Sequence, residues 1–264
     1  MNRLKDLIYS FIGLLAGRGG GRRRQGGDER TLIVRVDEIG DYMLWRPFLA
    51  EMAAHARQQG TVHFCGNRSW KNLFDTLDQE QVDETYWLDK IRFKKDMVYR
   101  YRFLRSVYRQ GYTTVINPSF SRDKRYDDAI TAAAKAPVTW GMVANTEAMR
   151  AYEYGYDKAV YTHLFNHTAK PVFEFYRNRL FSEFVTGRRS EIMNTRIDTD
   201  ILPPAKQQLP ENYFIVFPGS RSATRIWPAE NFAAVSRYLS SRYGATPVIC
   251  GAGSDKAYAA QFVL

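Results

Sequence analysis

Cysteine is scarce in this chain, and histidines in metal-binding patterns are rare as well. Only two cysteines occur in 264 residues, and Cys65 and Cys250 lie far apart in apolar, strand-like runs. We interpret them as small, reduced core residues, which argues against a disulfide. Among the four histidines only His163 and His167 have an i,i+4 spacing, and no cysteine or further histidine stands near them. The sequence therefore predicts neither a metal site nor a cofactor.

Long apolar runs are also absent, since none approaches the roughly 20 residues that cross a bilayer as a helix. Residues 1–30 nevertheless differ from the rest. An apolar helical face precedes a glycine-rich stretch with Arg22, Arg23 and Arg24. We interpret this segment as an amphipathic, basic leader on the anionic inner face of a membrane. A disordered leader and a signal peptide are the alternatives, although the arginines disfavour export. The apolar face comprises Leu4, Leu7, Ile8, Phe11, Ile12, Leu14 and Leu15.

Acidic residues are outnumbered by basic ones, which constrains the partners. The chain has 38 lysines and arginines against 28 aspartates and glutamates, for a net charge of +10. This excess favours an anionic partner, such as nucleic acid, a membrane surface or a phosphorylated substrate. No nucleic-acid recognition motif accompanies the charge, so we expect no nucleic-acid partner. A Walker-type phosphate loop is absent too.

Apolar runs and helical patterns alternate along most of the chain, which predicts an α/β fold with a parallel sheet covered on both faces. Residues 187–210 are polar and contain three prolines, and we interpret them as a linker. Two similar α/β parts result, at 31–200 and 201–264. The expected strands are 31–36, 62–65, 84–88, 113–117, 138–142, 213–217 and 247–250. The expected helices are 48–59, 69–77, 97–110, 127–136, 173–185 and 229–242.

The first strand, residues 31–36, leads into an acidic segment with one glycine, Asp37-Glu-Ile-Gly-Asp41. We interpret this segment as a tight turn, followed by a helix whose first turn contains Pro47. Ligands of open α/β sheets gather beyond the carboxyl ends of the strands, which is where Asp37 and Asp41 fall. Capping of a helix is the alternative role for Asp41, and the more common one for an isolated aspartate.

A second turn, after residues 213–217, is small, hydroxylated and basic. Its backbone N–H groups, with Arg221 and Arg225, suit a phosphate at a helix start. An ordinary solvated loop is the alternative. The later glycines, Gly251 and Gly253, form only a fragment of a dinucleotide-binding pattern and carry little weight alone.

Three stretches together carry a family resemblance. They are Leu32-Ile-Val-Arg-Val-Asp-Glu-Ile-Gly-Asp41 with Pro47-Phe-Leu49, then Phe217-Pro-Gly-Ser220 with Arg225-Ile-Trp-Pro-Ala-Glu-Asn-Phe232, and finally Cys250-Gly-Ala-Gly-Ser-Asp255. In this combination the chain resembles glycosyltransferase family 9, the heptosyltransferases of lipopolysaccharide core assembly, over about residues 31–264.

The resemblance implies a GT-B fold of two Rossmann-like domains and an inverting, metal-independent glycosyl transfer. It implies an acceptor-side domain at 31–200 and the start of a nucleotide-sugar-binding domain at 201–264. Asp41 falls where the family keeps its catalytic base, with Asp37 and Gly40 beside it on the acceptor side. Arg225 falls where a basic residue contacts the donor diphosphate, and Ser220 and Arg221 lie in the same turn. Asp255 lies roughly where an acid binds the donor ribose.

The implied donor is a nucleotide-activated heptose, ADP-linked, and the implied acceptor is an anionic glycolipid. The implied location is cytoplasmic, on the inner face of the bacterial inner membrane. A family stretch of the form Asp-x-Gly-x-x-His does not occur before Leu264, so the resemblance implies an incomplete second domain, from a fragment or a truncation. The alternative function is a non-catalytic, membrane-associated binding protein on the same fold.

Overall fold

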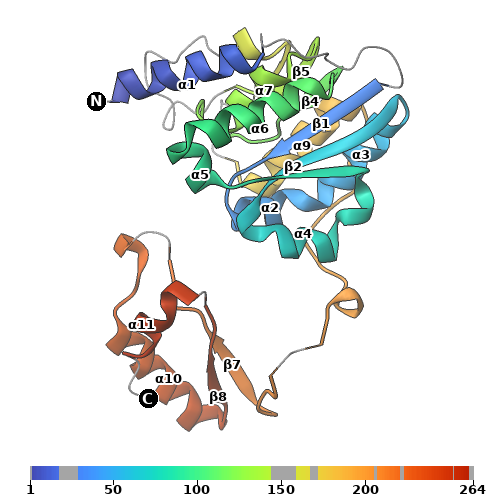
Figure 1. The fold of residues 1–264 in the computed structure, drawn as a ribbon. Coiled ribbons are helices and arrows are strands. Elements are labelled where there is room, and N and C mark those ends of the chain that lie inside the picture. The colour runs from blue at the N-terminus through green and yellow to red at the C-terminus, as the bar shows by residue number, and fades with distance from the viewer. Residues whose placement is uncertain are drawn as a thin grey trace. The chain divides into compact units, whose positions relative to one another are not determined.

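A computed structural model describes residues 2–17, 29–143, 159–166, 172–204, 207–220, 223–251 and 253–261. The chain divides into two compact units, Met1–Ile201 and Leu202–Leu264 (Figure 1). We describe each unit by itself.

The first unit is built on a six-stranded sheet in which every pair of neighbouring strands is parallel. The strand order is β3-β2-β1-β4-β5-β6, so the order reverses between β1 and β4. Such a reversal leaves a crevice at the carboxyl ends of the two strands, where open α/β sheets bind ligands. The strands are β1 Glu29–Arg35, β2 Gly60–Asn67, β3 Glu84–Leu88, β4 Thr114–Ile116, β5 Val138–Met142 and β6 His163–Phe165.

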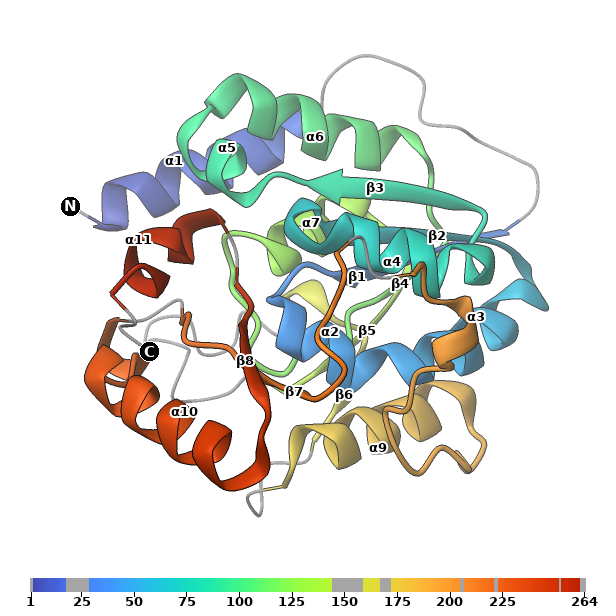
Figure 2. The same cartoon turned by 90° about the horizontal axis from the view of Figure 1, so that it is seen from below.

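Helices cover both faces of this sheet, as the alternating pattern predicts. Successive residues of β1 point to opposite faces, so Ile33 joins one buried cluster while Leu32 and Val34 join the other. Helices α2, α3, α4 and α9 contribute to the first cluster, and α1, α5, α6 and α7 to the second. Figure 2 shows α1, α5 and α6 on one side and α3 and α9 on the other. The helices are α1 Asn2–Ala16, α2 Ile39–Trp45, α3 Leu49–Arg57, α4 Lys71–Leu77, α5 Lys90–Lys95, α6 Met97–Arg109, α7 Asp127–Ala134 and α9 Glu174–Thr186.

The acidic segment after β1 differs from the predicted turn. Helix α2 already begins at Ile39, so Gly40 and Asp41 lie in its first turn. Glu38 and Asp41 form a reciprocal capping box, which satisfies backbone N–H groups at the helix start. Pro47 lies in a short 3₁₀ turn, Arg46–Phe48, that leads into α3. The expectation that Gly40 provides a turn conformation is wrong, because its φ is not positive.

The predicted linker, 187–210, is wrong for its first part. Residues up to Ile201 belong to the first unit. Ser190 is buried, and its backbone N–H donates to Glu183 Oε1 at 3.0 Å. Ile192 packs against the cluster that contains α9. The polar composition of the segment gave no sign of these contacts, because few of its residues, among them Ser190 and Ile192, attach it to the first unit.

The amphipathic segment near the start forms helix α1, which packs on α6 and α7. The Tyr9 hydroxyl donates to the Lys94 carbonyl at 2.8 Å, and Arg105 Nη1 donates to the Ala16 carbonyl at 2.8 Å. Residues 18–28, with the three consecutive arginines, lie outside the described residues. In the part of the chain that the structure describes, none of the helices combines the length and hydropathy needed to cross a membrane.

The second unit contains a two-stranded parallel sheet of β7 Tyr213–Val216 and β8 Thr246–Ile249, connected through helix α10 Ala229–Tyr243. A short helix, α11 Lys256–Ala259, follows. This is the strand–helix–strand arrangement that the sequence predicts for this part. The two cysteines are free thiols. Cys65 is buried in β2, as predicted, and burial raises the pKa of its thiol.

Candidate active site

The crevice between β1 and β4 is held by one buried arginine. Arg35, at the end of β1, is 1% exposed. Its Nη1 donates to the Pro118 carbonyl after β4, and its Nη2 donates to the Asp41 carbonyl, both at 2.9 Å. Its Nε lies 2.9 Å from Asp37 Oδ2. One guanidinium therefore fixes the loop after β4, the start of α2 and the Asp37 carboxylate, using the planar spread of its donors.

Asp37 is fixed through its backbone and retains a carboxylate oxygen for other contacts. Its carbonyl accepts hydrogen bonds from Asn67 Nδ2 at 3.0 Å and Trp70 Nε1 at 3.1 Å. Its Oδ1 is buried and has no hydrogen-bond partner among the residues that the structure describes. Burial raises the pKa of this carboxyl to about 7, against the opposing effect of Arg35, and the charge of Asp41 raises it further.

Asp41 caps helix α2, and its charge also interacts with the other carboxylates of the crevice. Its Oδ2 accepts a hydrogen bond from the Glu38 backbone N–H at 3.4 Å, which is a long bond. Its charge contributes to the raised pKa of both Asp37 and Glu174, so the three carboxylates interact with one another. A Cβ placed on Gly40 would meet no atom within 4 Å. The surface beside these carboxylates is therefore open at Gly40.

Glu174 and Arg177 belong to this site, and the sequence did not indicate either of them. Both lie in the first turn of α9, where they form an ion pair. The charges of Arg35 and Asp41 act on Glu174, so this turn lies beside the crevice. The guanidinium of Arg177 lies 3.7 Å from the ring centroid of Phe120, in the loop after β4. Burial raises the pKa of Glu174, with Arg35 and Arg177 opposing the rise. No local pattern marks these residues, because only the packing of α9 brings them to Asp41.

The raised pKa of Asp37 predicts a pH-dependent stability. The folded protein holds this proton between about pH 4 and pH 7 while the unfolded chain releases it, so the contribution of Asp37 to stability falls as the pH rises through this window. We expect the melting temperature of Asp37→Asn, measured relative to the unsubstituted protein at the same pH, to be higher at about pH 8 than at about pH 5. Thermal melting at both pH values measures this. An equal trend in Asp200→Asn, an exposed control in the same unit, would contradict the assignment.

In the second unit, two turns and one carboxylate come together. A Cβ placed on Gly219 would lie 2.5 Å from Asp255 Oδ2, and one placed on Gly251 would lie 2.9 Å from the same oxygen. The Asp255 carboxylate therefore lies against the turns that follow β7 and β8, and a larger residue at either glycine would displace this side chain. Ser220 is in the first of these turns. The predicted donor-binding residues Ser220 and Asp255 thus lie at the same end of this small sheet.

The predicted donor-side residues also include two arginines, Arg221 and Arg225. Arg225 ends the 3₁₀ turn Ala223–Arg225 and is exposed. Arg221 lies outside the described residues. Among the residues that the structure does describe, no group of three His, Cys, Asp or Glu side chains is arranged to hold a metal ion.

The fold defined by these units is that of GT-B-type glycosyltransferases, as comparison with solved structures shows. The crystal structure of the glycosyl transferase family 9 protein from Veillonella parvula DSM 2008 matches with a TM-score of 0.61 and 18% identity, over 92% of this chain and 68% of that chain. E. coli heptosyltransferase WaaC with ADP matches with a TM-score of 0.62 and 18% identity, over 89% of this chain and 72% of that chain.

The same E. coli enzyme with ADP-2-deoxy-2-fluoro heptose matches with a TM-score of 0.59 and 18% identity, over 88% of this chain and 74% of that chain. No family model matches the sequence, and no curated protein does. The structural matches confirm, at the level of the fold, the resemblance that the three sequence stretches carry. At this identity they establish the fold and leave the function to be argued from the site.

Proposed function

We propose that this chain is a glycosyltransferase that uses a nucleotide-sugar donor. The observation that carries the proposal is the pair of carboxylates, Asp37 and Asp41, at the carboxyl edge of the sheet where the strand order reverses. The open position at Gly40 leaves room beside them for an acceptor. The shared fold with solved glycosyltransferases supports this assignment.

In the proposed reaction Asp41 is the general base. It takes the proton of an acceptor hydroxyl as that oxygen attacks the anomeric carbon of the donor sugar. The bond between that carbon and the nucleoside diphosphate breaks on the opposite side, so the configuration inverts. Arg35 holds the start of α2 through the Asp41 carbonyl, at 2.9 Å, and so fixes the base. The first unit is the acceptor-side domain in this proposal.

The second unit is the proposed donor-side domain. Backbone N–H groups of the turn at Ser220, together with Arg221 and Arg225, bind the donor diphosphate. Their charge stabilises the leaving diphosphate, a role that needs no metal ion. Asp255 binds the donor ribose. The ligands named for E. coli WaaC, ADP and ADP-2-deoxy-2-fluoro heptose, support an ADP-heptose-like donor for this chain.

The proposed acceptor is an anionic glycolipid, such as a phosphorylated lipopolysaccharide core intermediate. The net charge of +10 suits such an acceptor and the anionic inner face of the bacterial inner membrane. The test is release of ADP from ADP-heptose with and without a phosphorylated lipid A–core acceptor. We expect release only when both are present. Donor binding in calorimetry without any release would instead support the non-catalytic binding protein.

Arg225→Ala is expected to raise the donor KM and lower turnover. Loss of a charge-assisted hydrogen bond to a phosphate costs about 1.5–3 kcal/mol, or about 10- to 150-fold in kcat/KM. Steady-state kinetics with varied donor measures this. Arg242→Ala is the matched control, because it removes an exposed cation from the far end of α10. Unchanged kinetics for Arg225→Ala would show that the basic turn is only a surface loop.

A further inference from the structure

Helix α1 presents an apolar surface to solvent even though it is packed on the first unit. Tyr9 and Ala16 are buried against the unit. Leu7 and Phe11, on the outer side, are 67% and 60% exposed. We call the outer set the apolar face of α1; it consists of Leu7, Ile8, Phe11, Leu14 and Leu15, each at least 41% exposed. Exposed contiguous apolar surface of this kind marks an interaction site.

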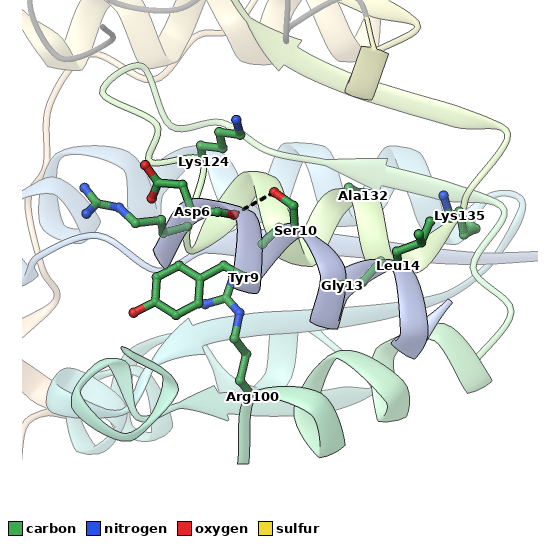
Figure 3. A pocket seen from close by; sticks show the side chains of 12 residues that line it. Asp6, Tyr9, Ser10, Gly13, Leu14, Arg100, Lys124, Ala132 and Lys135 are labelled. Atoms are coloured by element: carbon green, nitrogen blue, oxygen red, sulfur yellow. Dashed lines mark hydrogen bonds between the residues drawn. The ribbon is translucent and has the colours of Figure 1, made fainter. Parts of the chain in front are cut away.

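A basic cavity lies beside this face. It has a volume of about 210 Å³ and is lined by α1, by Arg100 of α6, and by α7 with the residues just before and after it (Figure 3). Three small residues of α7, Ala129, Ala132 and Ala133, form an uncharged wall. Leu14 both lines the cavity and belongs to the apolar face, so the two surfaces are continuous. A partner that binds the apolar face of α1 would therefore also reach the cavity.

The charges that line the cavity favour an anion. Four of its residues are cations and one is an anion, and these are Arg100, Lys124, Arg125, Lys135 and Asp6. Arg100 is held rigidly, with its guanidinium 4.3 Å from the ring centroids of Tyr9 and Phe93. Lys124 lies near the Asp6 end of the helix segment and Lys135 near the Leu14 end (Figure 3). Even with Asp123, the ion-pair partner of Arg125 at 3.1 Å, the cations remain in excess.

We propose that α1 and this cavity form a docking site for an anionic lipid bilayer. The apolar face enters the interfacial layer, and the cavity takes the phosphate-bearing headgroup of an acidic lipid. Helix α1 has 15 residues and a length of about 22 Å, which suits a helix lying in the plane of the interface. Apolar residues beside a basic cavity match the two parts of such a lipid, its acyl chains and its charged headgroup. The site is independent of the proposed transfer reaction.

Vesicle co-sedimentation of the full chain tests this proposal. Vesicles of phosphatidylcholine alone are compared with vesicles that also contain phosphatidylglycerol, at low and at high salt. We expect the unsubstituted protein to pellet with the anionic vesicles at low salt and to be released at high salt. Leu7→Ser with Phe11→Ser should reduce binding to both kinds of vesicle at least tenfold.

Two further variants separate the cavity from the apolar face. Lys124→Gln with Lys135→Gln should lower binding to anionic vesicles about 30-fold, since each surface cation contributes about fivefold. Binding to phosphatidylcholine should not change. Met193→Ser is the matched control: Met193 is 68% exposed in the same unit and contacts α9 through Arg179, on the opposite face of the sheet from α1. Melting temperature confirms that each variant is folded.

Four outcomes would overturn the proposal. The first is equal pelleting with both kinds of vesicle regardless of salt. The second is an unchanged preference for anionic vesicles in the lysine variant. The third is a dimer in light scattering that Leu7→Ser with Phe11→Ser converts to a monomer, without vesicle binding, because the apolar face would then be an interface between two copies. The fourth is binding of free glycerol phosphate that Lys124→Gln with Lys135→Gln abolishes while vesicle binding stays intact, because the cavity would then be a site for a soluble phosphate.

Discussion

Replacing Asp41 by asparagine is expected to lower transferase turnover by about 10²- to 10⁴-fold, the usual contribution of a general base. Asparagine preserves size and can still accept the hydrogen bond that Asp41 Oδ2 receives from the Glu38 N–H at 3.4 Å. It cannot accept the proton of the acceptor hydroxyl. Steady-state turnover is measured beside melting temperature and donor affinity, which we expect to stay nearly constant.

The design of this test follows from the double role of Asp41. If capping were its only function, asparagine would be an equally good residue and turnover would be retained. Asp96→Asn is the matched control, because Asp96 Oδ1 caps a different helix, α6, through the Tyr99 N–H at 2.9 Å. Full turnover in Asp41→Asn would make Asp37 the proposed base, since its buried Oδ1 has no hydrogen-bond partner within the described part of the chain.

Replacing Arg122 by methionine is expected to destabilise the protein by about 3–5 kcal/mol, the cost of breaking a buried ion pair by removing one partner. Arg122 Nη1 and Asp128 Oδ1 lie 2.8 Å apart and both side chains are 0% exposed. The Tyr161 hydroxyl donates to Asp128 Oδ1 at 2.6 Å, and Asn117 Nδ2 donates to that hydroxyl at 2.7 Å. The network thus ties the start of α7 to the residue that follows β4.

Urea unfolding of three variants tests this reasoning. Arg57→Met is the control, because its partner Asp83 is 40% exposed and such surface pairs contribute only about 0–1 kcal/mol. Combining Arg122→Met with Asp128→Asn should recover part of the lost stability, since the buried negative charge is then removed. A double variant no more stable than Arg122→Met would show that the buried charge is not the cause of the loss.

The predictions from sequence succeeded where local pattern decides the structure. The apolar, β-branched run at 31–36 corresponds to β1, Glu29–Arg35, and the alternation of such runs with helical segments indicated a parallel sheet covered on both faces. The prediction of a glycine turn at Gly40 failed because a capping box at Glu38 and Asp41 starts the helix earlier. The failure at Gly40 follows from backbone N–H groups at the start of α2 that find partners near in sequence.

The sequence by itself determined the α/β class and placed Asp37 and Asp41 beyond the carboxyl end of a strand. Both results depend on residues adjacent in the chain. Only the tertiary structure decided that β1 lies beside β4, that Arg35 joins the loops after both, and that α9 brings Glu174 and Arg177 to the same edge. It also placed α1 on α6 and α7, which formed the basic cavity. These features depend on contacts between segments far apart in sequence, and such contacts leave no mark in local periodicity or spacing.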